Sequence, residues 1–288
     1  MAGTPGTISR ILWHFTGGPR WSEGENRQET EPKPTEDAYK ALIGILTSRE
    51  LRIGQYKEVF RAPVPGPFTL RIVSAQIDDA VLEREYFPKT LESSPVCCLA
   101  DIPIIHLHYH AHRYGKIAIG FHRDAAIQHG FSPVLYQRYN SGIAKRTYEC
   151  ISNIQEVHRY RLTEGLEQSL AAVQNKVGSL PEEVSSALEE LSASLSYSEF
   201  LLEMPKDALM HVLAYVKTFD NSEFATIFAE REWRSVKPFN FQFDDVSMIV
   251  LPRNPGKGDH FKRFVKEAET IGLPKTVSVL AWDDLVEY

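Results

Sequence analysis

The sequence contains few cysteines and no long apolar run, and each absence excludes a class of protein. Its 288 residues include three cysteines, Cys97, Cys98 and Cys150, two of which are neighbours that could pair only through a strained bridge. A disulfide-rich secreted fold is therefore excluded, and reduced thiols predict a cytoplasmic protein. No stretch approaches the roughly 20 apolar residues of a membrane helix, and the N-terminal residues lack a cationic segment followed by an apolar one. We expect a soluble protein with no membrane contact and no export signal.

The sequence also lacks a basic excess and several common catalytic motifs. Its formal net charge is −6, which argues against a protein held to nucleic acid by bulk electrostatics. A phosphate loop of the Walker type, a G-x-G-x-x-G turn and a G-x-S-x-G elbow are all missing, which argues against nucleotide triphosphate hydrolysis and serine hydrolase chemistry. Apolar residues at 43% and charged residues at 24% are ordinary globular values, so disorder is not expected.

Strand and helix signals follow one another without a regular alternation. Short apolar or β-branched runs predict strands at residues 7–15, 96–100, 116–121, 133–138, 226–236, 245–251 and 277–282. Helical spacing predicts helices from Thr35 onward and at 78–87, 124–129, 207–218 and 260–271. Three prolines in 60–68 exclude a central strand there. We predict a single α+β domain over 1–288, with a split or mixed β-sheet core and a helical insertion at about 162–219.

A histidine-rich segment follows the expected strand at 96–100. The residues His106, His108, His110 and His112 would share one face of a strand, whereas in a helix they would pair as 106 with 110 and 108 with 112. Either arrangement could bind zinc. The sequence contains no Cys-x-x-Cys or His-Glu-x-x-His pattern, however. We therefore predict a site in this region but no bound metal.

Two acidic residues lie in the expected strand at 226–236. Glu230 and Glu232 should project to the same side, because side chains alternate along a strand. Two carboxylates at this spacing could stabilise a developing cation, which makes them the candidate catalytic pair. The alternative is a charged face whose acids form ordinary ion pairs with Arg231 and Arg234.

A histidine and a hydroxyl lie at the end of the first expected strand. The neutral imidazole of His14 and the hydroxyl of Thr16 could hold a ribose or a carbonyl group through directional hydrogen bonds. The alternative is that His14 simply satisfies backbone groups of the fold. The site interpretation requires that His14 and the two acids line one cleft, although about two hundred residues separate them.

Four segments together resemble the AbiGi family of abortive phage-resistance proteins. They read ILWHFTGG, CCLADIPIIHLHYHAHRYGKIAIGF, GFSPVLYQ and EREWRSV, in the order of the family and over most of the chain except the helical insertion. The resemblance implies a role in bacterial antiviral defence by abortive infection. It also implies an antitoxin role within a toxin–antitoxin system, beside a toxin partner.

Two stretches are also similar to the opening of ADP-ribosyltransferases of the H-Y-E type. They read LWHFTGG and ALIGILTSRELRIG, and the late Glu232-Trp233 pair resembles the family's Glu-Tyr strand. The resemblance implies an ADP-ribosyltransferase-like sheet in which His14 holds the ribose of NAD with help from Thr16. It further implies that Glu232 polarises the ribose hydroxyl as nicotinamide leaves, with Glu230 as the accessory acid.

The chain departs from that second family at two positions. Phe15 replaces the glycine that follows the histidine, and Cys98 replaces the tyrosine that stacks on nicotinamide, which leaves Tyr109 or Tyr114 to supply the ring. Further candidates for substrate binding are Asp101, His110, Tyr114 and Arg234.

Two hypotheses follow from the sequence. The first is an enzyme that cleaves or transfers from NAD, with NAD as its substrate and no bound cofactor. The second is a non-catalytic antitoxin or infection sensor that binds a toxin, an antitoxin or a phage protein through the insertion at 162–219.

Overall fold

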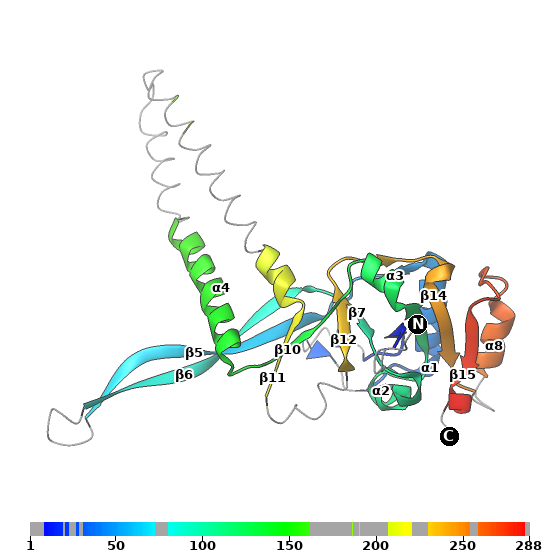
Figure 1. The fold of residues 1–288 in the computed structure, drawn as a ribbon, viewed down its shortest axis with the longest axis horizontal. Helices are drawn as coiled ribbons and strands as arrows, with labels where there is room; N and C mark the ends of the chain where they lie inside the picture. The colour runs from blue at the N-terminus through cyan, green and yellow to red at the C-terminus, as the bar shows by residue number, and fades with distance from the viewer. Residues whose placement is uncertain are drawn as a thin grey trace, which may run out of the picture.

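A seven-stranded sheet forms the centre of the fold (Figure 1). The computed structural model describes residues 9–19, 21–22, 27–28, 31–72, 80–161, 186, 190, 207–220, 230–253 and 259–285. The strand order is β15-β14-β8-β1-β7-β12-β9. The strands are β1 (Ile11–Phe15), β7 (Cys97–Ala100), β8 (Ala118–His122), β9 (Ser132–Pro133), β12 (Glu232–Ser235), β14 (Val246–Leu251) and β15 (Ser278–Ala281).

The pairing within this sheet is mixed, which confirms the predicted α+β class. Only β14 and β15 run parallel, while β1 is antiparallel to both of its neighbours. All five residues of β1 pair with β8, but the register with β7 contains one pair, Trp13 with Ala100. The two strands therefore diverge beyond Trp13 and leave a fork between β1 and β7. The likeness to ADP-ribosyltransferases stays a prediction.

Helices cover both faces of the sheet. One core cluster joins Leu12 and Leu99 of the sheet to Leu42 of α1 (Thr35–Ser48) and Phe264 of α8 (His260–Glu267). The other joins Trp13 and Ala100 to Leu107 of α2 (Leu107–Tyr114). Since successive side chains of a strand point to opposite faces, β1 contributes to both clusters. The short helix α3 (Arg123–Gln128) follows β8.

Helix α1 agrees with the local sequence pattern in its first residue and in the face that it buries. Pro34 occupies the N-cap position and Thr35 is the first helical residue, so Thr35 begins the helix as predicted but does not cap it. The apolar face that was predicted from helical spacing is buried at Ala38, Leu42 and Leu46. Burial of this face against the sheet fixes the helix beside the end of β1.

The predicted helix at 78–87 is wrong. Residues Ala80–Pro95 form β6, which pairs with β5 (Lys57–Ile72) in a two-stranded antiparallel ribbon that projects from the body (Figure 1). A partner strand of equal length satisfies the backbone of this segment, and this cross-strand pairing overrides the local helical pattern. The proline-rich segment 60–68 lies in β5 and outside the central sheet, which confirms that it is no central strand.

Several other boundaries also differ from the predictions. The strand expected at 133–138 is two strands, β9 and β10 (Leu135–Arg138), and β10 pairs in parallel with β11 (Val216–Phe219). The helix expected at 207–218 is helical over 207–213 only, and then β11 begins. Helix α8 ends at Glu267 instead of residue 271. The remaining short strands are β2 (Trp21–Ser22), β3 (Arg27–Gln28), β4 (Glu50–Leu51) and β13 (Phe239–Asn240).

A satellite core lies at the base of the projecting ribbon. Helix α4 (Gly142–Arg161), which was not predicted, packs on β5 together with the helical residues 207–213. The buried members of this cluster are Phe60, Ala62, Ala144, Ile151 and Leu213. Most of the expected insertion at 162–219 lies outside the described residues, so the insertion stays a prediction. Helix α4, which precedes that range, and Leu213 within it both contribute to this satellite core.

Two glycines lead to opposite stability predictions. At Gly120 a Cβ atom would approach Ile11 Cγ2 to 2.7 Å and Trp13 Cζ3 to 3.0 Å. We expect Gly120→Ala to lower the free energy of unfolding by about 1–3 kcal/mol, because overpacking shifts side chains in a filled core.

At Gly44 of α1 an added Cβ meets nothing within 4 Å. We therefore expect Gly44→Ala to raise the free energy of unfolding by roughly 0.5–1 kcal/mol, because alanine favours the helix over glycine. Urea unfolding measures both changes, and equal effects would contradict the packing.

Candidate functional site

A small cavity occupies the fork where β1 and β7 diverge. Its volume is about 130 Å³, and its lining residues are Trp13, His14, Phe15, Cys98, Leu99, Ala100, His110, Tyr114, Glu230 and Glu232. The structure therefore brings His14, Glu230 and Glu232 to one cavity, as the site interpretation requires. We call this space the fork cavity.

The strand register explains why only the fork can bring these residues together. Trp13 and Glu232 both lie opposite Ala100, so their side chains share one face of the sheet. His14 follows Trp13 and therefore belongs to the other face. In a continuous sheet the imidazole and the acids would be separated by backbone. Because β1 leaves β7 after Trp13, side chains from both faces reach the same space.

Glu230 and Glu232 converge for a reason other than strand alternation. Strand β12 begins at Glu232, Glu230 lies before it, and Arg231 between them has a left-handed backbone with φ of 38°. Both acids nevertheless reach Lys217 of β11, whose Nζ lies 2.5 Å from Glu230 Oε2 and 3.7 Å from Glu232 Oε2. The prediction that one strand presents both acids is wrong, although the two side chains do meet.

The carboxylate of Glu232 is held by groups of the chain itself. Arg234 Nη2 lies 2.7 Å from Glu232 Oε2, and the Cys98 thiol forms a side-chain hydrogen bond with the same carboxylate. Burial alone would raise the pKa of Glu232, but Arg234 and Lys217 lower it to about 2. Burial and the nearby Glu232 charge raise the pKa of Cys98 well above its usual value, so that thiol stays protonated. Glu232 therefore keeps its negative charge, and the positive charges of Arg234 and Lys217 compensate it.

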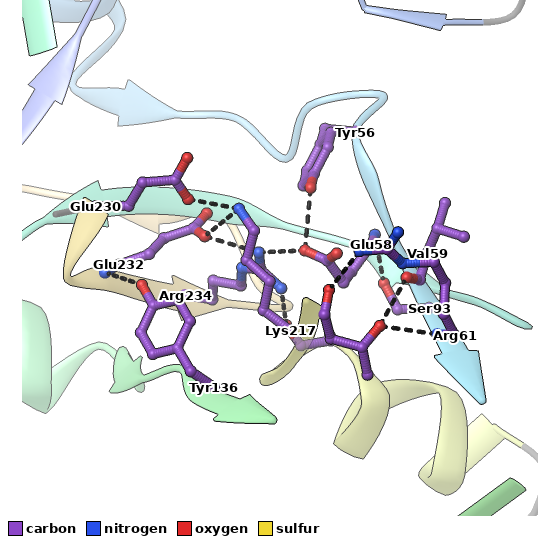
Figure 2. Close-up of polar contacts among 12 residues, drawn as sticks. Tyr56, Glu58, Val59, Arg61, Ser93, Tyr136, Lys217, Glu230, Glu232 and Arg234 are labelled. Atoms are coloured by element: carbon purple, nitrogen blue, oxygen red, sulfur yellow. Dashed lines mark hydrogen bonds and ion pairs between the residues drawn. The ribbon is translucent and has the colours of Figure 1, made fainter. Parts of the chain in front are cut away.

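Arg234 extends this network to the base of the ribbon (Figure 2). Its side chain is fully buried and donates to the Ala214 carbonyl at 2.7 Å and to Glu58 of β5 at 2.5 Å. The Tyr56 hydroxyl donates to the same Glu58 carboxylate at 3.0 Å. Arg234 Nε has no partner among the described residues. The predicted alternative of ion pairs with the acids is therefore present for Arg234, although the pairs are buried and not on an exposed face.

His14 lies on the opposite wall of the fork cavity, and Thr16 follows it outside that cavity. Both side chains form hydrogen bonds with backbone carbonyls. His14 Nδ1 lies 3.2 Å from the Cys98 carbonyl oxygen across the fork, and burial lowers the pKa of His14 so that the imidazole is neutral. The Thr16 hydroxyl is buried and donates to the Ile117 carbonyl at 3.5 Å. A second cavity of about 650 Å³ lies beside α1 and shares His14 and Phe15 with the fork cavity. Thr16 lines this second cavity only.

Helix α2 closes the fork cavity with aromatic rings. The His110 and Tyr114 rings stack with centroids 5.6 Å apart, and the Phe15 ring lies 5.8 Å from His110 and 6.1 Å from Tyr114. Of the two tyrosines considered for the missing ring, Tyr114 lines the cavity, whereas Tyr109 is 65% exposed on the surface. Burial lowers the pKa of His110, so this ring is also neutral at pH 7.

Three predicted site residues lie elsewhere, and Thr16 in the second cavity is the first of them. Asp101 lines a different cavity of about 530 Å³, where its carboxylate accepts a hydrogen bond from Arg231 Nη2 at 3.1 Å. Arg234 lies behind Glu232 in the buried network and does not line the fork cavity. Sequence reasoning missed Lys217 and Glu58, which no local pattern marks, because only the folded chain brings them to the acids.

The histidine-rich segment is mostly helical, with His108, His110 and His112 in α2. His106 closes the 3-10 turn Ile104–His106 that precedes α2. Within the described ranges, no group of three or more His, Cys, Asp or Glu side chains is placed to hold a metal ion. None of the helices in those ranges is long and apolar enough to cross a membrane.

These features define a mixed α+β protein with a forked sheet and a cavity lined by acidic and aromatic side chains. One of the acids, Glu232, forms ion pairs with Arg234 and Lys217. Comparison with known families identifies the family to which the chain belongs. The family model described as "Putative abortive phage resistance protein AbiGi, antitoxin" matches residues 78–256, which is more than half of the chain. The chain belongs to the AbiGi family, so it takes part in abortive phage resistance. No curated protein and no solved structure matches it.

Proposed function

We propose that this protein is the antitoxin of an abortive phage-resistance system in the bacterial cytoplasm, and that it acts by binding a toxin without catalysis. The family description supports the antitoxin role. The observation that carries the non-catalytic part is the state of Glu232, whose carboxylate is paired with Arg234 and Lys217.

The ion pairs of Glu232 conflict with the role of a catalytic carboxylate in ADP-ribosyl transfer. Cleavage of the nicotinamide bond needs a carboxylate directed at the developing cation of the ribose. Here Arg234, which is fully buried behind the cavity wall, pairs with the Glu232 carboxylate at 2.7 Å and draws its charge away from the cavity. Removing one partner of a buried ion pair costs roughly 3–5 kcal/mol. Glu232 therefore stabilises the junction between β12, β11 and the ribbon in place of a substrate.

The toxin contact lies, in this proposal, on the helical insertion at about 162–219 of a single α+β domain. Helix α4 and the helical residues 207–213 leave and re-enter the body at the satellite core, beside the base of the ribbon (Figure 1). Burial of Ile151 and Leu213 in that core supports the proposal, because these residues lie before and within the range assigned to the insertion. A contact on the insertion is thus connected through β5 and β11 to the buried ion-pair network.

A second candidate function is binding of NAD or a related nucleotide at the fork. It is favoured by the two cavities that meet at His14 and Phe15, with volumes of about 130 and 650 Å³. The larger one lies within the usual range of about 300–1,000 Å³ for small-molecule sites. In this candidate the fork cavity holds the nicotinamide ring and the larger cavity holds the remainder of the dinucleotide.

Expression of the protein in a bacterial host distinguishes the antitoxin from an enzyme that binds NAD at the fork and consumes it. We expect wild type to leave both the growth rate and the cellular NAD concentration unchanged, because Glu232 is not available for catalysis. Growth curves and an enzymatic NAD assay measure the two quantities, with Glu232→Gln as the matched variant. If wild type arrests growth or depletes NAD while Glu232→Gln does not, the antitoxin proposal fails and the enzyme hypothesis replaces it.

A further inference from the structure

Helix α2 places two of its histidines on one side of the helix. His108 and His112 are four residues apart, so their Cβ atoms lie about 5–6 Å apart on the same face. His112 is exposed and His108 is half-buried. Figure 1 shows α2 on the outside of the body. Two imidazoles at this spacing can therefore reach one point at the protein surface.

The ring nitrogens of His108 and His112 have no hydrogen-bond partner in the part of the chain that the structure describes. His14 differs, because its Nδ1 lies 3.2 Å from the Cys98 carbonyl oxygen. The Tyr109 ring lies 4.1 Å from the His108 ring, and this contact limits the rotation of that imidazole. Since neutral imidazole is the commonest protein ligand of metal ions, the two side chains are available as ligands.

The other histidine pair with the same spacing does not form such a site. His110 is 8% exposed, and its ring stacks on Tyr114 at the wall of the fork cavity. Its sequence partner His106 is exposed and closes the 3-10 turn before α2. One imidazole of this pair is therefore inside the protein and the other is outside. Of the two pairs that a helix makes possible, the fold leaves only His108 with His112 open to a ligand.

The surroundings of this pair favour a cation but supply few further ligands. His112 lies in the last turn of α2, where the helix dipole has its negative end. The neighbouring Arg113 approaches Glu230 of the fork cavity at 3.5 Å. The sequence from Ile102 to Arg123 contains no acidic residue. Because no group of three or more His, Cys, Asp or Glu side chains among the described residues is placed to hold a metal ion, these residues offer an open pair and not a closed set.

We propose that His108 and His112 form an open site for one divalent transition-metal ion, such as Ni²⁺, Cu²⁺ or Zn²⁺. Imidazole suits these ions, whereas Mg²⁺ and Ca²⁺ prefer oxygen ligands. Water, or a donor group of a binding partner, completes the coordination. The inference goes beyond the proposed antitoxin function and does not depend on it. It replaces the expectation of no bound metal, which rested on the missing Cys-x-x-Cys and His-Glu-x-x-His motifs.

Titration of the untagged protein with Ni²⁺ or Zn²⁺ tests the site, with Mg²⁺ as the comparison. We expect saturable binding of Ni²⁺ or Zn²⁺ in calorimetry and no saturable binding of Mg²⁺. His108→Gln and His112→Gln should each weaken binding by at least about tenfold, since even the outer partners of a metal ligand contribute that much to affinity. Urea unfolding without metal checks that both variants fold, and either one suffices if the other does not.

His106→Gln is the matched control, because it removes an exposed imidazole of the same segment and leaves the pair intact. It should leave the affinity unchanged. An equal loss in this variant, equal binding of Mg²⁺, affinity that survives both pair substitutions, or no saturable binding of Ni²⁺ and Zn²⁺ overturns the site. The growth assay of the antitoxin proposal does not depend on this metal, so either proposal can fail alone.

Discussion

Replacing Arg234 by alanine is expected to lower the free energy of unfolding by roughly 3–5 kcal/mol, because it leaves two buried carboxylates without their shared cation. Glu58 is 7% exposed and Glu232 is 13% exposed at the side chain, so water cannot take over the role of the guanidinium. The Ala214 carbonyl loses its donor as well. Urea unfolding at neutral pH measures the loss for wild type and variant.

Arg253 provides a matched control for this change. It forms two hydrogen bonds with the Asp284 carboxylate, at 2.6 and 2.9 Å, so its geometry is as good as that of Arg234. Both side chains are exposed, however, at 42% and 53%. We expect Arg253→Ala to cost less than about 1 kcal/mol, since solvent screens such pairs. Similar losses for the two variants would show that burial does not decide the strength of the Arg234 network.

Strands with a continuous apolar run could be predicted from the sequence, while the strand that depends on a distant partner could not. The runs at β7 and β14 contain few polar residues, and both strands lie inside the sheet with a helix-covered face. Strand β6 has the charged and apolar mixture of an amphipathic helix, and its extended state depends on β5, which lies before it in the chain. Cross-strand pairing overrides local preference in such segments.

The candidate site could be predicted only in part, because some of its contacts also depend on segments that are distant in the sequence. His14 could be selected because it lies near the end of an expected strand and Glu232 because of its spacing from Glu230, and the structure brings both to the fork cavity. The identity of their partners is a tertiary property. Lys217 stands at the start of β11, in a segment that sequence spacing assigned to a helix. Because the sequence does not show Lys217 beside Glu232, it left both the catalytic role and the ion-pair alternative open for this acid.

The buried network also links the fork cavity to the surfaces that the proposed function uses. Arg234 connects Glu232 of the cavity wall to Glu58 at the base of the ribbon, and Lys217 connects both cavity acids to β11 (Figure 2). β11 follows the helical residues 207–213 after a two-residue turn. In the proposed function, a partner that binds the insertion would therefore contact a segment that is connected to this network through Lys217.

Acid should destabilise wild type more than Glu232→Gln. Arg234 and Lys217 hold the pKa of Glu232 at about 2 in the folded state, against an ordinary value of 4.5. A lowered pKa means that the stabilisation is complete above about pH 4.5 and disappears as the pH falls through about 2. Over that window we expect wild type to lose on the order of 3 kcal/mol relative to the variant, because the variant has no carboxylate to protonate.

The measurement is urea unfolding of both proteins at several pH values from neutral down to about pH 2, with the difference in free energy of unfolding plotted against pH. Wild type should be the more stable protein at neutral pH, and its advantage should shrink only below about pH 4.5. Glu92→Gln is the control, because Glu92 is 59% exposed and solvent screens its ion pair with Lys57. Parallel curves for wild type and Glu232→Gln would mean that Glu232 is not held ionised by its neighbours. The non-catalytic assignment of this carboxylate would then lose its physical basis.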